Sequence, residues 1–188
     1  MCGIVGLVDY HYEINLRETL AEMAGQLRHR GPDSEGIWSD ETGHIGLAHT
    51  RLAILDASPA GSQPMESKSG RFVIVFNGEI YNHKAIRLEL QAQNQVSWIG
   101  SSDTETLIAA IEQWGCVATV KKLVGMFAFA LWDRDLKTLK LARDRAGEKP
   151  LYYGRTNNVF FFGSELRVAK KIPGFKNKVS RDALALYL

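Results

Sequence analysis

Residues 1–8 of the chain read MCGIVGLV, an apolar stretch with no charge and with a cysteine directly after the initiator methionine. This stretch is too short to span a membrane, and no basic segment precedes it, so it is not a signal peptide. Its pattern predicts a strand over residues 3–9. Cys2 is either a small core residue or, once Met1 is removed, an N-terminal residue that carries both a thiol and a free α-amine.

The composition is that of one ordinary folded domain. The 188 residues are 45% hydrophobic and 23% charged, and the net charge is +2. These values give no reason to expect nucleic-acid or membrane binding. The two cysteines make no disulfide framework, and the five histidines show no metal-ligand spacing, so we expect no metal site. No targeting segment is visible, and we therefore expect a cytoplasmic protein.

Strands and helices occur in separate groups along the chain. The apolar spacing predicts a helix over 14–29, a loop over 53–65 and turns at 133–137 and 157–158. Further helices are predicted over 83–92, from Ser102 or Asp103 to 114, and over 117–123, 165–171 and 180–188. Further strands are predicted over 36–39, 44–50, 72–77, 126–133, 138–144, 151–156 and 158–164. Antiparallel strand runs with helices grouped between them predict an α+β layered domain rather than a doubly wound α/β fold.

Five residues could supply the groups that a cysteine-dependent reaction needs. The α-amine of an N-terminal Cys2 has an ordinary pKa of about 7.7–8.0, so a useful fraction is neutral and can act as a base. Asn77 and Gly78 follow a buried strand and could form an oxyanion hole, although Asn-Gly is also a common turn. Arg51 could bind a carboxylate or form a surface ion pair, and Asp103 could bind an ammonium group or cap a helix.

Eight separated motifs resemble those of one protein family, in the same order. They are MCGIVG (1–6), RHRGPDSEG (28–36), HTRLAILD (49–56), VFNGEIYNH (75–83), SSDTET (101–106), GMFAFALWD (125–133), RDRAGEKPLYY (143–153) and SELRVA (164–169). The chain is thereby similar to the class II glutamine amidotransferase domain of glutamine-hydrolysing asparagine synthetases. The resemblance implies the N-terminal nucleophile hydrolase fold, a four-layer αββα sandwich.

The same resemblance implies a role for each site residue. Cys2 is the expected nucleophile toward the side-chain amide of L-glutamine, with its α-amine as the base. Asn77 and Gly78 are the expected oxyanion hole, and Glu79 and Asp103 the expected ligands of the α-ammonium group. Arg51 is expected to bind the α-carboxylate, and the backbone that follows it is expected to line the same pocket, namely Leu52, Ala53, Ile54 and Leu55.

The resemblance also implies that residues 1–188 are the amidotransferase domain of a longer protein. The expected partner is a C-terminal synthetase domain in cis, which would use ATP and magnesium to amidate aspartate. Neither an SGGxDS nor a GxxxxGK[ST] loop occurs here, so no cofactor is expected in this domain. A homodimer is left open. The alternatives are a catalytically silent regulatory or structural domain, and an amidotransferase domain that serves another acceptor.

Overall fold

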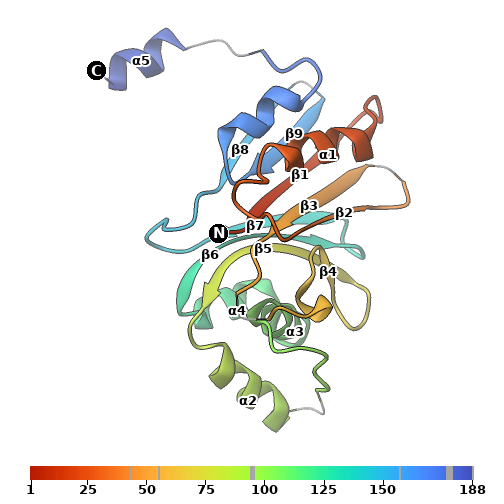
Figure 1. Ribbon diagram of the computed structural model, residues 1–188, viewed down its shortest axis with the longest axis vertical. Helices are drawn as coiled ribbons and strands as arrows, with labels where there is room; N and C mark the ends of the chain where they lie inside the picture. Colours follow the sequence, from red (N-terminus) through yellow and green to blue (C-terminus); the bar gives the residue numbers. More distant parts are fainter. Residues whose placement is uncertain (43, 55, 94–95, 157, 177–179, 188) are drawn as a thin grey trace.

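Two antiparallel sheets lie face to face in the middle of the structure, a computed structural model that describes residues 1–188 except 43, 55, 94–95, 157, 177–179 and 188 (Figure 1). Sheet A has the strand order β2-β3-β1-β9-β8, and sheet B the order β4-β5-β6-β7. The strands are β1 (Gly3–Asp9), β2 (Ser34–Ser39), β3 (Ile45–Arg51), β4 (Met65–Glu66), β5 (Phe72–Ile80), β6 (Gly125–Asp133), β7 (Thr138–Arg143), β8 (Tyr152–Arg155) and β9 (Val159–Gly163).

Strand β1 is the central strand of sheet A, and this position explains its uninterrupted apolar sequence. All of its residues are buried, because β3 and β9 pair with its two edges and other layers cover both faces. Val5 and Leu7 face the α1 side, whereas Ile4 and Val8 belong to the core between the two sheets. A strand that is covered on both faces has no position that favours a polar residue.

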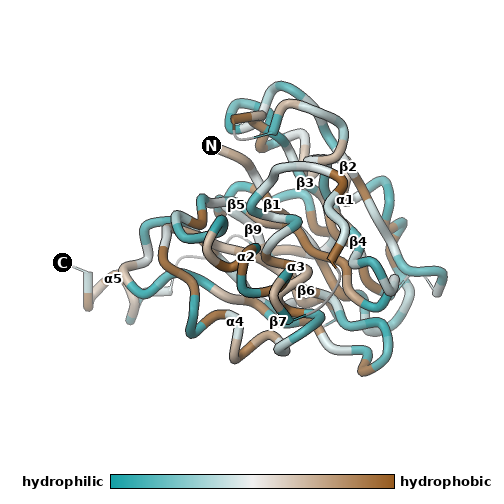
Figure 2. Tube along the Cα trace, turned by 90° about the horizontal axis from the view of Figure 1, so that it is seen from below, coloured by the Kyte–Doolittle hydropathy of each residue, from teal (hydrophilic) through white to brown (hydrophobic). Residues whose placement is uncertain are grey.

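Helices cover the outer face of each sheet and complete four layers. α1 (Leu16–Gly25) and the 3-10 helix η2 (Leu166–Lys171) pack on sheet A, while α2 (His83–Gln93), α3 (Asp103–Trp114) and α4 (Cys116–Lys122) lie on the side of sheet B (Figure 1). The hydrophobic colour follows many of the interior strands, and hydrophilic colour prevails on many loops (Figure 2). The predicted α+β fold with an αββα sandwich is confirmed.

Several predicted boundaries differ from the observed ones. The helix predicted over 14–29 begins only after Asn15, whose side chain accepts a hydrogen bond from Glu18 N at 3.3 Å, and it ends at Gly25 before a series of turns. The helix predicted over 165–171 is the 3-10 helix η2, which begins at Leu166 and has fewer residues per turn than an α-helix. The loop predicted over 53–65 contains a 3-10 turn, η1 (Pro59–Gly61), and its last residue begins β4.

The prediction that Asn77 and Gly78 follow the end of a strand is wrong. β5 continues to Ile80, because β6 pairs with it along its whole length and Ile80 lies opposite Gly125. The Asn-Gly pair therefore lies inside a strand and is not a turn. Gly78 is required there by close packing, because a Cβ atom would contact Met126 O and lie 2.7 Å from Phe127 Cα.

The C-terminal part of the chain folds against the sandwich as far as η2. The final helix, α5 (Arg181–Tyr187), has no buried residue and projects from the sandwich (Figure 1). The predicted helix over 180–188 is therefore observed, except that residue 188 lies outside the described residues. The predicted turn at 157–158 includes residue 157, which also lies outside the described residues.

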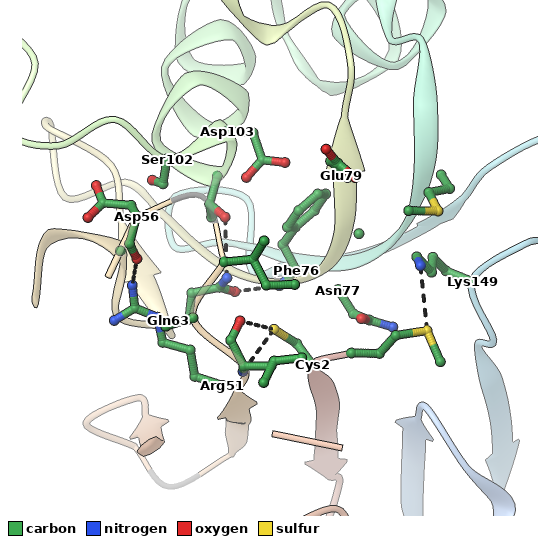
Figure 3. A pocket seen from close by; sticks show the side chains of 18 residues that line it. Cys2, Arg51, Asp56, Gln63, Phe76, Asn77, Glu79, Ser102, Asp103 and Lys149 are labelled. Carbon is green, nitrogen blue, oxygen red and sulfur yellow. Dashed lines mark hydrogen bonds between the residues drawn. The ribbon is translucent and has the colours of Figure 1, made fainter. Parts of the chain in front are cut away.

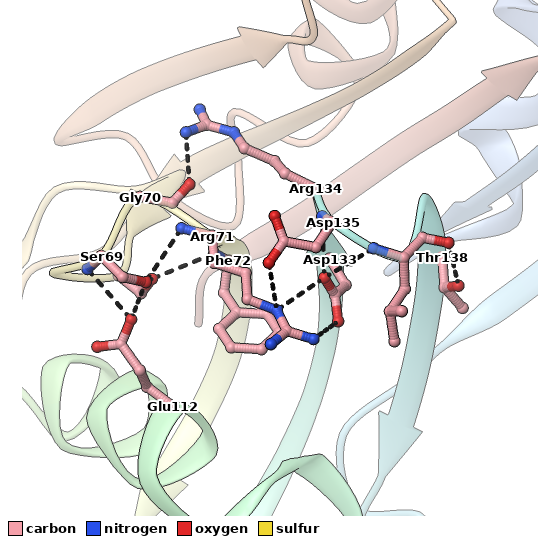
Figure 4. A network of polar contacts seen from close by, with 11 residues as sticks. Ser69, Gly70, Arg71, Phe72, Glu112, Asp133, Arg134, Asp135 and Thr138 are labelled. Carbon is pink, nitrogen blue, oxygen red and sulfur yellow. Dashed lines mark hydrogen bonds and ion pairs between the residues drawn. The ribbon is translucent and has the colours of Figure 1, made fainter.

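A polar network fixes the end of sheet B that lies away from Cys2 (Figure 4). The Arg71 guanidinium donates to both carboxylate oxygens of buried Asp133, at 3.0 and 2.8 Å, and holds the pKa of that carboxyl below its usual range. Asp133 also accepts from Asp135 N and Leu136 N at 3.1 and 3.2 Å. These contacts form the predicted turn over 133–137, which is confirmed.

Candidate active site

A pocket lies at the end of the sandwich where β1 begins, β3 ends and α3 begins (Figure 3). Its cavity holds about 160 Å³. The structure brings nearly all of the predicted site residues to this one pocket. They are Cys2, Arg51, Leu52, Ala53, Ile54, Asn77, Gly78, Glu79 and Asp103. Leu55, the remaining predicted residue, lies outside the described part of the chain.

Two contacts with the Leu52 backbone hold the Cys2 side chain. The thiol donates to Leu52 O at 3.6 Å, and Leu52 N donates to Sγ at 3.4 Å. Burial raises the pKa of the Cys2 thiol, and this effect exceeds the opposing effect of the Leu52 contact. The sulfur is therefore a thiol at neutral pH and requires a base before it can attack a substrate.

No histidine is among the described residues that line the pocket. His49, two residues before Arg51, lies between the sheets with its Nε2 atom 3.2 Å from Phe76 O. Burial lowers the pKa of His49 to about 4, so its ring is neutral at physiological pH and packs as part of the core. A base for Cys2 must therefore come from another group.

The Asn77 side chain has an unused hydrogen-bond donor. Asn77 is 1% exposed, and its Nδ2 atom is buried without a partner among the described residues. A buried amide without a partner is unfavourable for stability and is characteristic of a site that awaits a ligand. Asn77 and Gly78 are adjacent on β5, and both line the pocket.

The Arg51 guanidinium is fixed by the loop that follows it. Its Nη1 atom donates to Ser58 O at 3.0 Å, and its Nη2 atom donates to Asp56 O. Asp56 in turn accepts from Ser101 N at 2.7 Å, which joins this loop to the segment before α3. Hydrogen bonds from Ser58 and Ser101 hold the pKa of the Asp56 carboxyl below its usual range. Arg51 is thus a buried cation oriented by backbone carbonyls.

Two acids lie on the side of the pocket that β5 and α3 form (Figure 3). Asp103 is in the first turn of α3 and accepts from Ile80 N at 2.9 Å. Burial raises the pKa of Asp103, although the Ile80 contact opposes that shift. Glu79 is half-buried beside it on β5. A buried arginine and two acids in one small pocket match the opposite charges of an amino-acid zwitterion.

The family model described as "Glutamine amidotransferase domain" matches residues 1–188. The chain belongs to this family. A solved structure of glutamine phosphoribosylpyrophosphate amidotransferase from B. subtilis superposes on 90% of this domain and 43% of its own chain, with a TM-score of 0.77 and 20% identity. At 20% sequence identity, this structural similarity supports a shared fold and no further conclusion.

Curated relatives of this amidotransferase domain include two named as asparagine synthetases. Asparagine synthetase [glutamine-hydrolyzing] 3 of Bacillus subtilis is 37% identical over 190 residues, which are 98% of this chain and 30% of the relative. A putative asparagine synthetase [glutamine-hydrolyzing] of Methanocaldococcus jannaschii is 37% identical over 205 residues, which are 100% of this chain and 39% of the relative. The domain therefore spans well under half the length of these relatives.

Two residues that line the pocket of the amidotransferase domain, Gln63 and Lys149, were not predicted from the sequence. Gln63 joins β5 to α3, since its Oε1 atom accepts from Phe76 N at 2.6 Å and its Nε2 atom donates to Thr104 Oγ1 at 3.2 Å. Arg30 donates to Cys2 O at 3.0 Å, and Lys149 lines the pocket. Arg30 and Lys149 occur in the quoted motifs, so those motifs were the available signal, whereas Gln63 lies in a stretch that reads only as a loop.

Within the described ranges, no group of three His, Cys, Asp or Glu side chains could hold a metal ion. None of the helices in the described part is long and apolar enough to cross a membrane. Cys2 and Cys116 are both free thiols.

Proposed function

We propose that this domain hydrolyses L-glutamine to glutamate and ammonia with Cys2 as the nucleophile. The observation that carries the proposal is the position of the half-buried Cys2 thiol, in one pocket with the unpaired Asn77 amide, the fixed Arg51 cation and the acid Asp103. These groups supply the three requirements of amide hydrolysis by a cysteine, namely a nucleophile, an oxyanion donor and a means of orienting the substrate.

The charges of the pocket fit glutamine in one orientation. Arg51 binds the α-carboxylate, and Asp103 and Glu79 bind the α-ammonium group. The Asp103 carboxyl gains a cationic partner in this complex, which offsets the cost of its burial. The backbone of Leu52, Ala53 and Ile54 lines the pocket beside Arg51. The side-chain carboxamide then extends toward Cys2.

Removal of Met1 makes Cys2 the N-terminal residue. Its neutral α-amine takes the thiol proton, and Sγ attacks the carboxamide carbon. Asn77 Nδ2 and the Gly78 N–H stabilise the oxyanion of the tetrahedral intermediate. Ammonia leaves with the proton from the α-ammonium group, and a thioester remains. Water then attacks the thioester through a second tetrahedral intermediate, which releases glutamate and restores the thiol. None of these steps needs a cofactor.

The fate of the ammonia belongs to the longer protein that the relatives indicate. We propose that residues 1–188 are the N-terminal amidotransferase domain of an asparagine synthetase. A C-terminal synthetase domain in cis would use ATP and magnesium to activate aspartate for attack by the ammonia. The lengths of the two relatives support this arrangement, since the domain accounts for 30% and 39% of them.

Glutamate release from L-glutamine by the purified chain tests the proposal. Intact mass first establishes that Met1 has been removed. We expect steady release by the native sequence, loss of release to background in Cys2→Ala, and unchanged release in Cys116→Ala, which replaces the other free thiol. Turnover retained in Cys2→Ala would exclude the Cys2 mechanism. A processed native chain that neither binds nor hydrolyses glutamine would instead identify a silent domain.

A further inference from the structure

Lys149 is a buried cation that the reaction above does not use. The residue is 7% exposed and lines the pocket from the loop between β7 and β8. Its backbone is held at both ends, because Lys149 N donates to Asp144 Oδ2 at 3.0 Å and Lys149 O accepts from Arg143 Nε at 2.6 Å. Asp144 also accepts from Phe127 N of β6 at 3.2 Å, which fixes the loop against sheet B. The lysine is therefore positioned by rigid elements.

The Lys149 ammonium has no carboxylate partner among the described residues. Its Nζ atom contacts Met1 Sδ at 3.5 Å, and a thioether is a weak acceptor for an ammonium group. Met1 is also the residue whose removal exposes the Cys2 amine. In the processed protein the ammonium loses even this contact and faces the space that Met1 leaves beside Cys2. An ammonium group that faces a pocket and has no carboxylate partner among the described residues favours an anion in the space beside it.

The geometry of the pocket indicates which part of a ligand supplies that anion. Figure 3 shows Arg51 and Lys149 on opposite sides of Cys2. Arg51 and the two acids already provide partners of opposite charge for the α-carboxylate and the α-ammonium group of the ligand. Lys149 lies at the other end, where the side chain of the ligand reaches the nucleophile. Glutamine carries no charge at this end, whereas glutamate, formed when water cleaves the thioester, carries a γ-carboxylate there.

We propose that Lys149 binds the γ-carboxylate of glutamate and makes the processed site prefer the product glutamate over the substrate glutamine at its side-chain end. This inference rests on the proposed function, because it takes the pocket to be the glutamine site. Hydrolysis converts the neutral carboxamide of the ligand into a carboxylate, which adds one negative charge beside the Lys149 ammonium. Lys149 therefore favours hydrolysis within the pocket and slows the release of glutamate.

Binding of the two amino acids to an inactive chain tests the role of Lys149. The parent is Cys2→Ala without Met1, which keeps a small N-terminal residue and cannot turn over glutamine. Dissociation constants for L-glutamate and L-glutamine are measured by calorimetry on this parent and after the addition of Lys149→Met. We expect the dissociation constant of L-glutamate to rise about tenfold or more in Lys149→Met, because a hydrogen bond between two charged groups is lost. The dissociation constant of L-glutamine should change less than about threefold, since its neutral carboxamide makes no charge pair with Lys149.

Two further variants separate charge from packing. Lys149→Arg keeps the cation and should retain most of the glutamate affinity. Lys84→Met removes an exposed lysine of α2 by the same substitution and should change neither constant. Equal weakening of both amino acids by Lys149→Met would show a structural role and overturn the inference, as would unchanged glutamate binding. A parent that binds neither amino acid would overturn the proposed function itself, which distinguishes the two failures.

Discussion

At the scale of single residues, the site depends on groups whose environment is unfavourable in the absence of a ligand. The Asn77 amide is buried without a partner, the Cys2 thiol is held in the protonated form by burial, and Asp103 is a carboxyl with a raised pKa. Each of these costs folding free energy that the core must offset. Their presence together in one pocket indicates selection for binding and chemistry rather than for stability.

His49 gives the domain a pH-dependent stability. Its folded pKa of about 4 lies below the ordinary value of 6.5, because burial disfavours the charged ring and the nearby Arg51 adds to this effect. Above pH 6.5 the ring is neutral in both states, so its stabilising effect is fully present. As the pH falls toward 4, the unfolded chain gains a proton that the folded chain does not, and stability declines.

Urea unfolding at pH 7.5 and pH 5.0 measures this effect. We expect His49 to account for a loss of about 2 kcal/mol in the free energy of unfolding between these two pH values. His49→Gln removes the titrating ring and should shrink the pH dependence by that amount, whatever the other groups contribute. His11→Gln, at an exposed histidine after β1, serves as the control. An identical pH dependence in His49→Gln would contradict the assignment.

At the scale of elements, the start of α3 shows how a helix terminus serves the pocket. Ser102 is the N-cap, and its Oγ atom accepts from Glu105 N at 3.2 Å. The Glu105 carboxylate returns to the preceding segment and accepts from Ile99 N at 2.7 Å. The sequence left the cap open between Ser102 and Asp103. Because Ser102 caps the helix, the Asp103 carboxylate is available for Ile80 and the pocket.

Removal of this cap should weaken the domain by a measurable amount. Ser102→Ala leaves Glu105 N without its acceptor in a half-buried position, and we expect a loss of about 1 kcal/mol, within the range of 0.5–2 kcal/mol for N-caps. Urea titration at neutral pH gives the value. Ser180→Ala is the matched control, because Ser180 caps the exposed α5, which buries no residue. We expect less than about 0.5 kcal/mol there. Equal losses in the free energy of unfolding for the two substitutions would show that the N-cap of α3 stabilises the domain no more than the N-cap of the exposed α5.

At the scale of the whole molecule, the two sheets bring the halves of the site together. Cys2 directly precedes β1 and Arg51 ends β3, both in sheet A, whereas Asn77, Gly78 and Glu79 are on β5 of sheet B. The distance between Cys2 and Asn77 is therefore set by the packing between the sheets. Ile4, Leu47, Val75, Trp132 and Phe162 are among the buried residues of this inter-sheet core.

The sequence predicted this architecture where local signals were strong. β1 was recognisable from its uninterrupted apolar residues, and the motifs around Arg51, Asn77 and Asp103 predicted residues that the structure brings to one pocket. The extension of β5 through Gly78 was not predictable locally, because Asn-Gly favours a turn and only the pairing with β6 overrides that preference. Lys149 and Gln63 were missed for a similar reason. Their roles depend on loops that tertiary contacts fold into the pocket.

The inter-sheet core should be sensitive to the loss of a single side chain. Leu47 is fully buried in β3 between the sheets, and Leu47→Ala should lower the free energy of unfolding by about 2–5 kcal/mol through lost transfer energy and a residual cavity. Leu184→Ala makes the same substitution in α5, where the side chain is 46% exposed, and should cost less than about 0.5 kcal/mol. Equilibrium urea unfolding of both variants measures the difference. A loss below about 1 kcal/mol in Leu47→Ala would contradict close packing between the sheets, because it would mean that the surrounding side chains can fill the vacated space at almost no cost. Since Arg51 is on the same strand as Leu47, a large loss would also show that this packing stabilises the strand that carries Arg51 to the pocket.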